Sequence, residues 1–238
     1  MKYYFISGTS RGIGKAIVEN LLKDEDIHIT GISRNNTISH PNYTHIKLDL
    51  SKPEKTSSFI FPNTPDAEEI VLINNAGVMS EIKRIGQQEN KNIINDYNVN
   101  IVSPSILINH FIKTYQNYTS KRIILNISSG AGRHTIDAWS VYCASKSALD
   151  MISKNIHLEQ SFFPEENRIK IFSIAPGVIE TKMQEQIRQT SEKDFSDVKK
   201  FVNLKNNGLL SSPGETAKLL LKIINGNYSD VISDVREL

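Results

Sequence analysis

The chain has 238 residues, 39% hydrophobic and 23% charged, which is the composition of a soluble globular protein. Its 28 Lys and Arg residues nearly balance 26 Asp and Glu residues, and no segment gathers the positive charge that a nucleic-acid partner would need. A single cysteine, a strand-like start where an export signal would need a longer apolar core, and no apolar run of about 18 residues together predict a cytoplasmic protein without a membrane span.

Short, nearly continuous apolar runs alternate along the chain with longer stretches that have helical spacing. The apolar runs are typical of strands covered on both faces, and they span residues 3–7, 27–33, 46–50, 69–77, 122–128 and 169–177. The predicted helices span residues 12–24, 87–117, 139–163 and 212–225. This alternation predicts an α/β fold, a doubly wound (Rossmann) parallel sheet with helices on both faces. Because no linker is evident, we expect residues 1–238 to form a single domain.

A glycine-rich turn, SGTSRGIGKAI at residues 7–17, joins the first predicted strand to the first predicted helix. Gly8 would take the tight turn, Gly12 would let the backbone approach a pyrophosphate, and Gly14 would permit close packing of helix on strand. The spacing of the first two glycines is wider than in the usual dinucleotide fingerprint. The strand before and the helix after still favour a dinucleotide site over a turn without a ligand.

Tyr142 and Lys146 stand four residues apart in a predicted helix, so their side chains share one face. The ordinary tyrosine pKa of about 10 is too high for proton transfer at neutral pH, and we expect the lysine and a positively charged nicotinamide to lower it. Hydride addition to a carbonyl leaves an alkoxide, which Tyr142 would protonate while Ser129 holds the oxygen. Taken singly, each residue also has an ordinary structural interpretation, as packing, solvated surface or cap.

Six short motifs follow one another along the chain: GTSRGIG at 8–14, NNAG at 74–77, VN at 99–100, ISS at 127–129, YCASK at 142–146 and PG at 176–177. In this order they make the chain resemble the short-chain dehydrogenases/reductases over almost its whole length. The resemblance implies a catalytic set of Asn100, Ser129, Tyr142 and Lys146, in which Lys146 also binds the nicotinamide ribose and Asn100 holds a water of the proton relay. The neighbouring alternatives, Asn98 and Ser128, fit the family pattern less well.

The choice of cofactor depends on the end of the second strand, where an NAD site carries an acidic residue for the ribose 2′-hydroxyl. Here Ser33 takes that position and Arg34 follows it, while Arg11 in the glycine turn adds a second guanidinium. Guanidinium groups suit bidentate contact with a phosphate, so we predict NADP(H) rather than NAD(H).

The predicted cofactor contacts come from the glycine turn, the second strand and the family motifs, and we expect no metal. They are Gly8, Ser10, Arg11, Gly12, Ile13, Gly14, Arg34, Asp49, Asn75, Ala76, Gly77, Tyr142, Lys146, Pro176, Gly177 and Thr181. By resemblance alone, Asp49 would contact the adenine, Asn75 and Gly77 would line the adenosine side, and Thr181 would lie near the nicotinamide amide. Asp49 is equally consistent with a turn residue at a strand end.

The substrate side is predicted from fewer residues. The polar stretch at about 180–210 follows the Pro-Gly motif and is expected to be a mobile lid or, alternatively, a helical excursion on the surface. Trp139 lies three residues before Tyr142 on the same helical side and would line an aromatic pocket or belong to the core. Cys143 is expected to serve packing only.

A finer resemblance concerns WSVYCASKSALDM, APGVIETKMQEQIR and the closing LLKIINGNYSDVISD. These stretches look like the branch that contains sepiapterin reductases and bacterial benzil reductases, which reduce one ketone of a dicarbonyl. A vicinal diketone or a sepiapterin-like compound is then the expected substrate. In sepiapterin reductases an aspartate near the C-terminus anchors the pterin; Asp234 falls near the matching place, with Asp230 close by, and Asp234 is also consistent with a strand end.

The sequence thus favours an NADPH-dependent carbonyl reductase that forms a secondary alcohol. Two alternatives remain: a non-catalytic NADPH-binding redox sensor, and an alcohol dehydrogenase that works in the oxidative direction. By resemblance, the two long helices around Val102 and Ala148 would pair across a two-fold axis and make a homodimer or homotetramer.

Overall fold

The computed structural model describes residues 1–226 and 228–237 of the chain. The strands are β1 (Lys2–Ser7), β2 (Ile27–Ser33), β3 (Tyr43–Lys47), β4 (Glu69–Asn74), β5 (Lys121–Ile127), β6 (Lys170–Ala175) and β7 (Ile232–Asp234). They form one parallel sheet in the order β3-β2-β1-β4-β5-β6-β7. Strand order reverses between β1 and β4, and ligands of such sheets bind at the carboxyl ends of the strands near that point. The expected doubly wound α/β fold is confirmed.

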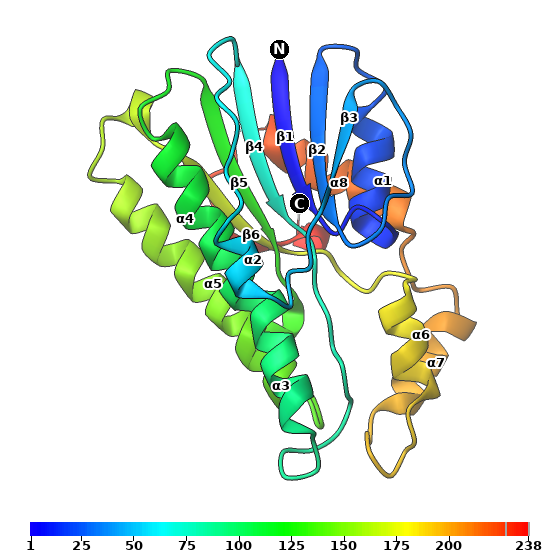
Figure 1. Ribbon diagram of the computed structural model, residues 1–238. Coiled ribbons are helices and arrows are strands. Elements are labelled where there is room, and N and C mark those ends of the chain that lie inside the picture. The colour runs from blue at the N-terminus through cyan, green and yellow to red at the C-terminus, as the bar shows by residue number, and fades with distance from the viewer. Residues whose placement is uncertain (227, 238) are drawn as a thin grey trace.

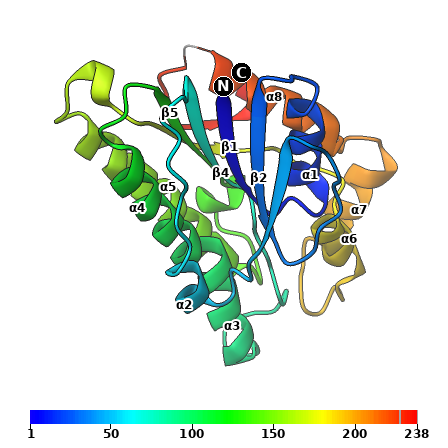
Figure 2. The same ribbon diagram turned by 45° about the horizontal axis from the view of Figure 1, so that its top comes forward.

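Helices cover both faces of this sheet (Figures 1 and 2). The long helices are α1 (Gly12–Leu21) and α8 (Pro213–Asn225) on one face, and α4 (Ser103–Tyr115) and α5 (Ser140–Gln160) on the other. Successive strand residues point to opposite faces, so Tyr4 and Ile6 join the core beneath α1 and α8, whereas Phe5 joins the core beneath α4 and α5. Each face therefore has its own apolar core, as a sheet covered on both sides requires.

The shorter elements gather mostly beyond the carboxyl ends of the strands (Figure 1). They are α2 (Pro53–Thr56), α3 (Asn90–Tyr97), a π-helical segment (Asn98–Val102), α6 (Lys182–Gln189) and α7 (Val198–Asn206). The single helix predicted for residues 87–117 is therefore interrupted: α3 leads through the π-helical segment into α4. A π-helical turn changes which face its residues present, and such turns occur often at functional sites.

The predicted strand at residues 46–50 is displaced toward the N-terminus, because β3 ends at Lys47. Leu48 and Leu50 are buried, yet the chain between them turns, since Asp49 Oδ1 accepts hydrogen bonds from the backbone N–H (3.1 Å) and the hydroxyl (2.9 Å) of Ser51. The predicted strand therefore extended past the real end of β3 and included residues of the following turn. The short β7 was absent from the predicted runs; it ends at Asp234.

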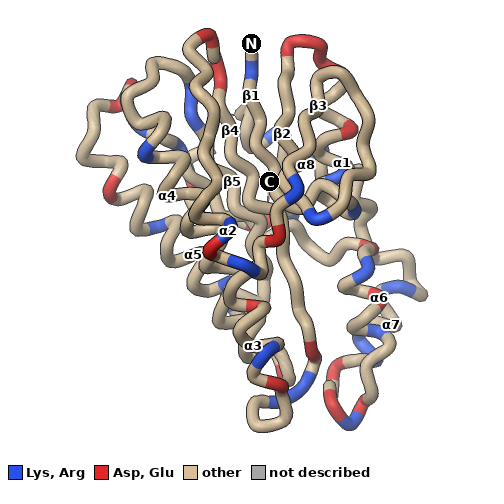
Figure 3. The backbone as a smooth tube through the Cα atoms, in the orientation of Figure 1, with Lys and Arg blue, Asp and Glu red and all other residues tan. Residues whose placement is uncertain are grey.

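Both signs of charge are interspersed along the chain (Figure 3). Within residues 1–226 and 228–237, no helix combines the length and the apolarity needed to cross a membrane. The same residues contain no group of three or more His, Cys, Asp or Glu side chains placed to hold a metal ion.

The glycine turn after β1 is tied closely to the end of β4. Asn75 Nδ2 donates to the carbonyl oxygens of Ser7 (3.0 Å) and Gly8 (3.1 Å). A Cβ atom on Gly14 would lie 2.4 Å from both Asn75 Nδ2 and the Gly8 carbonyl oxygen. Only glycine therefore lets α1 start this close to the turn.

We expect Gly14→Ala to lower the free energy of unfolding by about 1–3 kcal/mol, because the added methyl group forces the turn and Asn75 apart. The matched control is Gly214→Ala, which also lies in the first turn of a helix; its Cβ would approach nothing nearer than Ser212 Oγ at 4.0 Å. This control should be neutral or stabilising by up to about 1 kcal/mol. Urea unfolding of both variants checks the prediction, and equal stabilities would contradict it.

Candidate active site

The four predicted catalytic residues come from three segments that meet at the carboxyl ends of β4 and β5. Asn100 lies in the π-helical segment, Ser129 lies two residues after β5, and Tyr142 and Lys146 lie in the first turns of α5. Gly77, just after β4, marks where they meet: a Cβ atom there would lie 3.5 Å from Lys146 Nζ and 3.7 Å from Asn100 Oδ1. The structure therefore brings the predicted set together.

Lys146 is buried, with 3% of its surface exposed. Its Nζ donates to the carbonyl oxygen of Ile127 (2.8 Å) and lies 5.8 Å from the centre of the Tyr142 ring. Burial lowers the pKa of Lys146 to about 8, and the negative charge of Asp150 opposes that shift. The lysine is thus anchored at the end of β5, one turn along the helix from the phenol.

Burial also governs Tyr142, which is 7% exposed. Burial raises the pKa of the Tyr142 phenol to about 12, and a hydrogen bond with Ser129 acts in the opposite direction. The expected lowering by Lys146 is wrong for the protein alone: desolvation of the phenolate is the main cause of the shift, and the Lys146 Nζ donates to the carbonyl oxygen of Ile127 and not to the phenol. The phenol is consequently protonated at neutral pH, the state that a proton donor requires.

Ser129, and not Ser128, is the serine that contacts Tyr142. Ser129 is half-buried, and its Oγ also accepts a hydrogen bond from the backbone N–H of Ala131 (3.2 Å). Ser128 is 3% exposed, and within the described residues its Oγ has no hydrogen-bond partner. Of the two serines, Ser129 is therefore the one that lies against Tyr142.

Asn100 is held on both sides of its amide. Its Oδ1 accepts from the N–H of Val78 (2.8 Å), and its Nδ2 donates to the carbonyl oxygen of Val78 (2.8 Å) and to Ser145 Oγ (3.2 Å). Asn98 instead donates to the carbonyl oxygen of Ser51 (3.0 Å). Asn100 is the asparagine beside Lys146, and it fixes the backbone that follows the NNAG motif.

The predicted cofactor residues surround the glycine turn. Ser10, Arg11, Gly12, Ile13 and Gly14 form the turn and the start of α1. A Cβ atom on Gly12, where φ is +57°, would lie 3.8 Å from Thr181 Cγ2, so the turn faces the segment after β6 that also holds Pro176 and Gly177. Backbone N–H groups of Asn75 and Ala76 donate to Ser7 Oγ (3.0 and 3.1 Å) and complete the wall at β4.

At the end of β2, Arg34 is exposed, as is Arg11 in the turn. Burial raises the pKa of Asp49, but hydrogen bonds from Ser51 and the charges of Arg34 and Lys52 outweigh it, so the net pKa is below its ordinary value. The Asp49 carboxylate thus accepts the hydrogen bonds of a turn, and its contact with an adenine stays a prediction. Open exposed guanidinium groups beside a glycine cradle fit a phosphate-bearing dinucleotide.

His45 at this edge was missed by the sequence reasoning. Its Nε2 lies 3.0 Å from Ser33 Oγ, whose hydroxyl donates to the carbonyl oxygen of Asn35 (2.8 Å). The strand pairing of β2 with β3 brings the two residues together. No local sequence pattern indicated this contact, because it joins positions 12 residues apart on different strands.

Residues 180–210 contain α6 and α7, which lie beyond the carboxyl ends of the strands (Figure 1). The apolar cluster that contains Trp139 and Tyr142 also contains Ile187 of α6, Phe201 of α7 and Phe195 from the connection between these two helices. The two ends of this segment lie side by side. The backbone N–H of Glu180 donates to the carbonyl oxygen of Ser211, and the backbone N–H of Ser211 donates to that of Val178 (both 3.0 Å). It is a helical pair with an apolar underside, a form compatible with a lid.

Trp139 packs within this cluster at 6% exposure. Its ring centre lies 5.6 Å from that of Phe195, 5.5 Å from that of Phe201 and 5.8 Å from that of Tyr142. Within the described residues its indole N–H has no hydrogen-bond partner. Trp139 is thus a core residue of the cluster that borders Tyr142. Cys143 is half-buried and packs against the same cluster.

The connection between α6 and α7 is bound to residues 84 and 137 by contacts that the sequence reasoning missed. Arg84 donates to both carboxylate oxygens of Asp137 (2.9 and 2.8 Å) and to the carbonyl oxygen of Lys193 (3.3 Å). The backbone and side chain of Ser196 also donate to Asp137 (3.2 and 3.0 Å). The opposite charges of Arg84 and Asp137 were visible in the sequence, but the two residues are 53 positions apart, so their pairing could not be predicted from it.

Asp234 is buried at the end of β7, and its carboxylate accepts hydrogen bonds from the side chain of Arg236 (2.8 and 2.6 Å). Burial raises the pKa of Asp234, yet Arg236 and the charge of Arg133 hold it below its ordinary value. Asp234 therefore lies at a strand end with an arginine partner, and its role toward a substrate stays a prediction. Asp230 is exposed and lies before β7.

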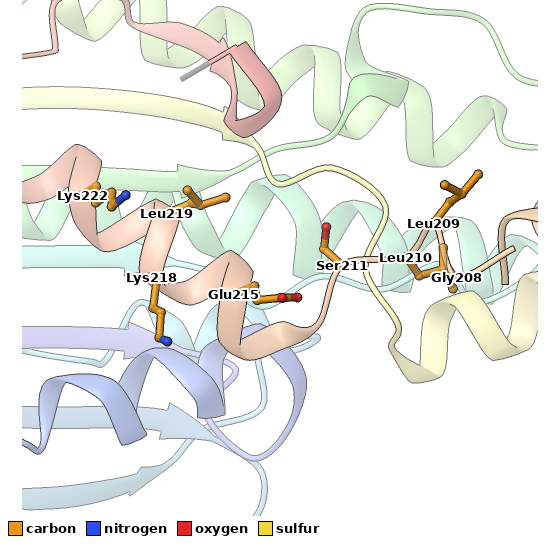
Figure 4. A pocket seen from close by; sticks show the side chains of 8 residues that line it. All are labelled: Gly208, Leu209, Leu210, Ser211, Glu215, Lys218, Leu219 and Lys222. Atoms are coloured by element: carbon orange, nitrogen blue, oxygen red, sulfur yellow. The ribbon is translucent and has the colours of Figure 1, made fainter.

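A wide hollow of about 550 Å³ lies elsewhere, between α8 and the end of the helical pair (Figure 4). It is lined by Gly208, Leu209, Leu210, Ser211, Glu215, Lys218, Leu219 and Lys222. None of these residues belongs to the predicted catalytic or cofactor set.

Comparisons with known proteins agree with this geometry. The family described as short chain dehydrogenase matches residues 2–192. Benzil reductase ((S)-benzoin forming) of Bacillus subtilis (strain 168) is 35% identical over 245 residues, which cover 100% of this chain and 99% of that protein. Sepiapterin reductase of Mus musculus is 28% identical over 166 residues, covering 68% of this chain and 61% of that protein.

A solved structure shows the same architecture over the whole chain. The crystal structure of the enzyme KRED1-Pglu superposes with a TM-score of 0.78 at 25% identity, covering 97% of this chain and 98% of that one. Family match, relatives and fold all lead to one assignment. The chain belongs to the short-chain dehydrogenase/reductase family, and it is an oxidoreductase that acts on alcohol and carbonyl groups.

Proposed function

We propose that this protein is an NADPH-dependent carbonyl reductase that converts one ketone of a vicinal diketone into a secondary alcohol. The observation that carries the proposal is the contact of Ser129 with a buried, protonated Tyr142, one helical turn from Lys146. The relative that matches over the whole chain is named for reducing benzil, a vicinal diketone, and this supports the substrate class. The sepiapterin-like alternative has support from a shorter match.

The chain's own residues supply orientation and a proton. The nicotinamide cofactor that this family uses supplies the hydride. Ser129 Oγ orients the substrate oxygen beside the Tyr142 hydroxyl, and the phenol donates its proton to the alkoxide as negative charge develops there. The charge of Lys146 stabilises the resulting phenolate, and Asn100 keeps the loop after β4 in place. The cluster of Trp139 with α6 and α7 limits the access of water.

The substrate specificity is proposed to follow from the apolar walls of the site. Met79, Ile82 and Ile187 join Trp139 and Tyr142 in the cluster beneath α6 and α7. An aryl or alkyl group next to the reacting carbonyl would be accepted by such walls, whereas a charged group would lose its solvation there. We propose that α6 and α7 act as the lid, with its tip held by Arg84 and Asp137.

We expect purified protein to oxidise NADPH in the presence of benzil, and Tyr142→Phe to lower kcat by about 10²–10⁴-fold, because the phenyl ring keeps the packing and lacks the proton. NADPH binding, followed by its fluorescence, should persist in the variant. The matched control is Tyr3→Phe, which removes a hydroxyl bonded to Asp66 at the opposite end of β1.

The alternatives predict other results in this assay. Binding of NADPH without turnover of any diketone, sepiapterin or aldehyde would favour the redox sensor. A rate of secondary-alcohol oxidation well above the rate of reduction at neutral pH would favour the dehydrogenase. Unchanged turnover in Tyr142→Phe would remove Tyr142 from the mechanism.

Arg34→Ala tests the proposed preference for NADPH. The exposed guanidinium at the end of β2 would bind the 2′-phosphate, and a charge-assisted contact of about 1.5–3 kcal/mol corresponds to an increase of about 10–100-fold in the KM for NADPH. The KM for NADH should stay within about twofold. Arg168→Ala, another exposed arginine, which donates to the carbonyl oxygens of Phe163 and Ser161, is the control. Equal changes for both cofactors would refute the assignment.

The proposed dimer would form through α4 and α5. Met151 and Leu158 expose 56% and 59% of their surfaces seven residues apart on α5, and Val102 exposes 38% where the π-helical segment meets α4. Spacing of seven places the first two on one helical face. Burial of such a face between two copies is the usual route to a two-fold oligomer.

We expect Met151→Glu to shift the protein from twice the chain mass, or a multiple of it, to the monomer mass, because a carboxylate would be buried at the pairing face. Light scattering during gel filtration measures the mass. Leu209→Glu, at another exposed leucine, should leave the mass unchanged. A monomeric parent protein, or equal masses for all three, would exclude this interface.

A further inference from the structure

The catalytic helix carries a buried carboxylate to which the proposed reaction assigns no part. Asp150 follows Lys146 by four residues and Tyr142 by eight, so the three side chains lie along one stripe of α5. Asp150 is 6% exposed. A charge kept inside a protein needs partners, and those partners indicate what the charge does.

The Asp150 carboxylate joins three parts of the structure. Its Oδ1 accepts a hydrogen bond from Ser173 Oγ in β6 (2.6 Å), and its Oδ2 pairs with Arg133 Nε (3.4 Å). The same guanidinium donates through a second nitrogen to the carbonyl oxygen of Ser233 in β7 (2.9 Å). Asp150 and Arg133 therefore bridge α5, β6 and β7.

Arg133 stands at the end of the loop that carries Ser129. This loop, residues 129–133, is pressed onto α5: a Cβ atom on Gly132 would lie 2.9 Å from the carbonyl carbon of Lys146. Ser147 Oγ donates to the carbonyl oxygen of Gly132 (2.6 Å). The ion pair thus closes the end of a loop whose other end holds the serine against Tyr142.

We propose that Asp150 and Arg133 form a positioning pair for the catalytic set: the pair fixes the Ser129 loop on α5, and the Asp150 charge keeps Lys146 in its ammonium form. The inference rests on the proposed reductase function. Neither residue touches the reacting atoms, and both act through Ser129 and Lys146.

Asp150 and Arg133 carry opposite charges, so they should change the pKa of Lys146 in opposite directions. On α5 itself, Tyr142 and Asp150 face Lys146, and the Asp150 charge raises the pKa that burial lowers. From the loop, Arg133 partly neutralises Asp150. Two uncharged polar groups also pack on α5: Ser173 from β6 and Asn100 from the π-helical segment. Two further carboxylates come from neighbouring elements: Asp96 of α3, which accepts a hydrogen bond from Ser80, and Asp234 of β7, which is paired with Arg236.

The test compares two variants whose effects on pH dependence differ in sign. Asp150→Asn keeps an oxygen for Ser173 and removes the charge, so the basic limb of the kcat/KM profile should move to lower pH by about one pH unit. Arg133→Gln removes the cation and leaves Asp150 to act on Lys146 undiminished, so the limb should move to higher pH. Both variants should lower kcat, because the Ser129 loop is loosened.

Ser173→Ala is the control for a purely structural role. It removes a hydrogen bond to Asp150 and leaves both charges, so it should lower stability without moving the basic limb. If all three variants lower kcat and leave the limb in place, the pair is structural and the proposal is overturned. A shift of the same sign in Asp150→Asn and Arg133→Gln would also overturn it.

A second readout separates this inference from the proposed function. The pH dependence of NADPH binding, followed by fluorescence, should move in the same two directions, since the charge of Lys146 bears on the cofactor site. A parent protein that binds NADPH and reduces no carbonyl would refute the proposed function alone, and the binding data would still decide the role of the pair. Unchanged binding profiles in both variants would refute the positioning pair.

Discussion

One buried hydrogen bond, from Lys146 Nζ to the carbonyl oxygen of Ile127, sets the geometry on which the site depends. It fastens the start of α5 to the last residue of β5. Ser129 follows Ile127 by two positions, and Tyr142 precedes Lys146 by one helical turn. The hydrogen bond between Lys146 and Ile127 therefore brings Ser129 close to Tyr142. The energy for holding a desolvated lysine there comes from the sheet and both cores, which fix strand and helix independently of the site.

A few hydrogen bonds likewise hold together the predicted cofactor side of the site. Asn75 uses its amide to join the turn after β1 to the end of β4, at the point where the strand order reverses. Gly14 lets α1 begin in contact with that amide. The glycine turn is thus fixed to the sheet by hydrogen bonds, the exposed Arg34 follows the end of β2, and the apolar cluster around Trp139 contains Tyr142. One side of the site is thus polar and the other apolar, which suits the proposed pairing of a dinucleotide with an aryl or alkyl ketone.

Much of this arrangement was readable from sequence, because apolar runs, helical spacing and the glycine turn are local patterns. The Tyr142 and Lys146 pair was found by its spacing, and Ser129 and Asn100, chosen by family resemblance, lie beside that pair. Long-range and energetic features were not readable. The π-helical turn at Asn100, the Arg133 and Asp150 pair, and the balance that raises the pKa of Tyr142 all depend on which segments pack together and how deeply they are buried. The region 180–210 shows the same limit, since its polar composition hid two inward-facing phenylalanines.

We propose that the protein promotes transfer of a hydride and a proton to one carbonyl of a diketone. Mass spectrometry of the benzoin formed from benzil with NADPH deuterated at the transferable position tests it most directly. We expect one deuterium, bound to the new carbinol carbon, with the hydroxyl proton taken from solvent. Benzoin without deuterium, or no benzoin from protein shown to bind the cofactor, would contradict it.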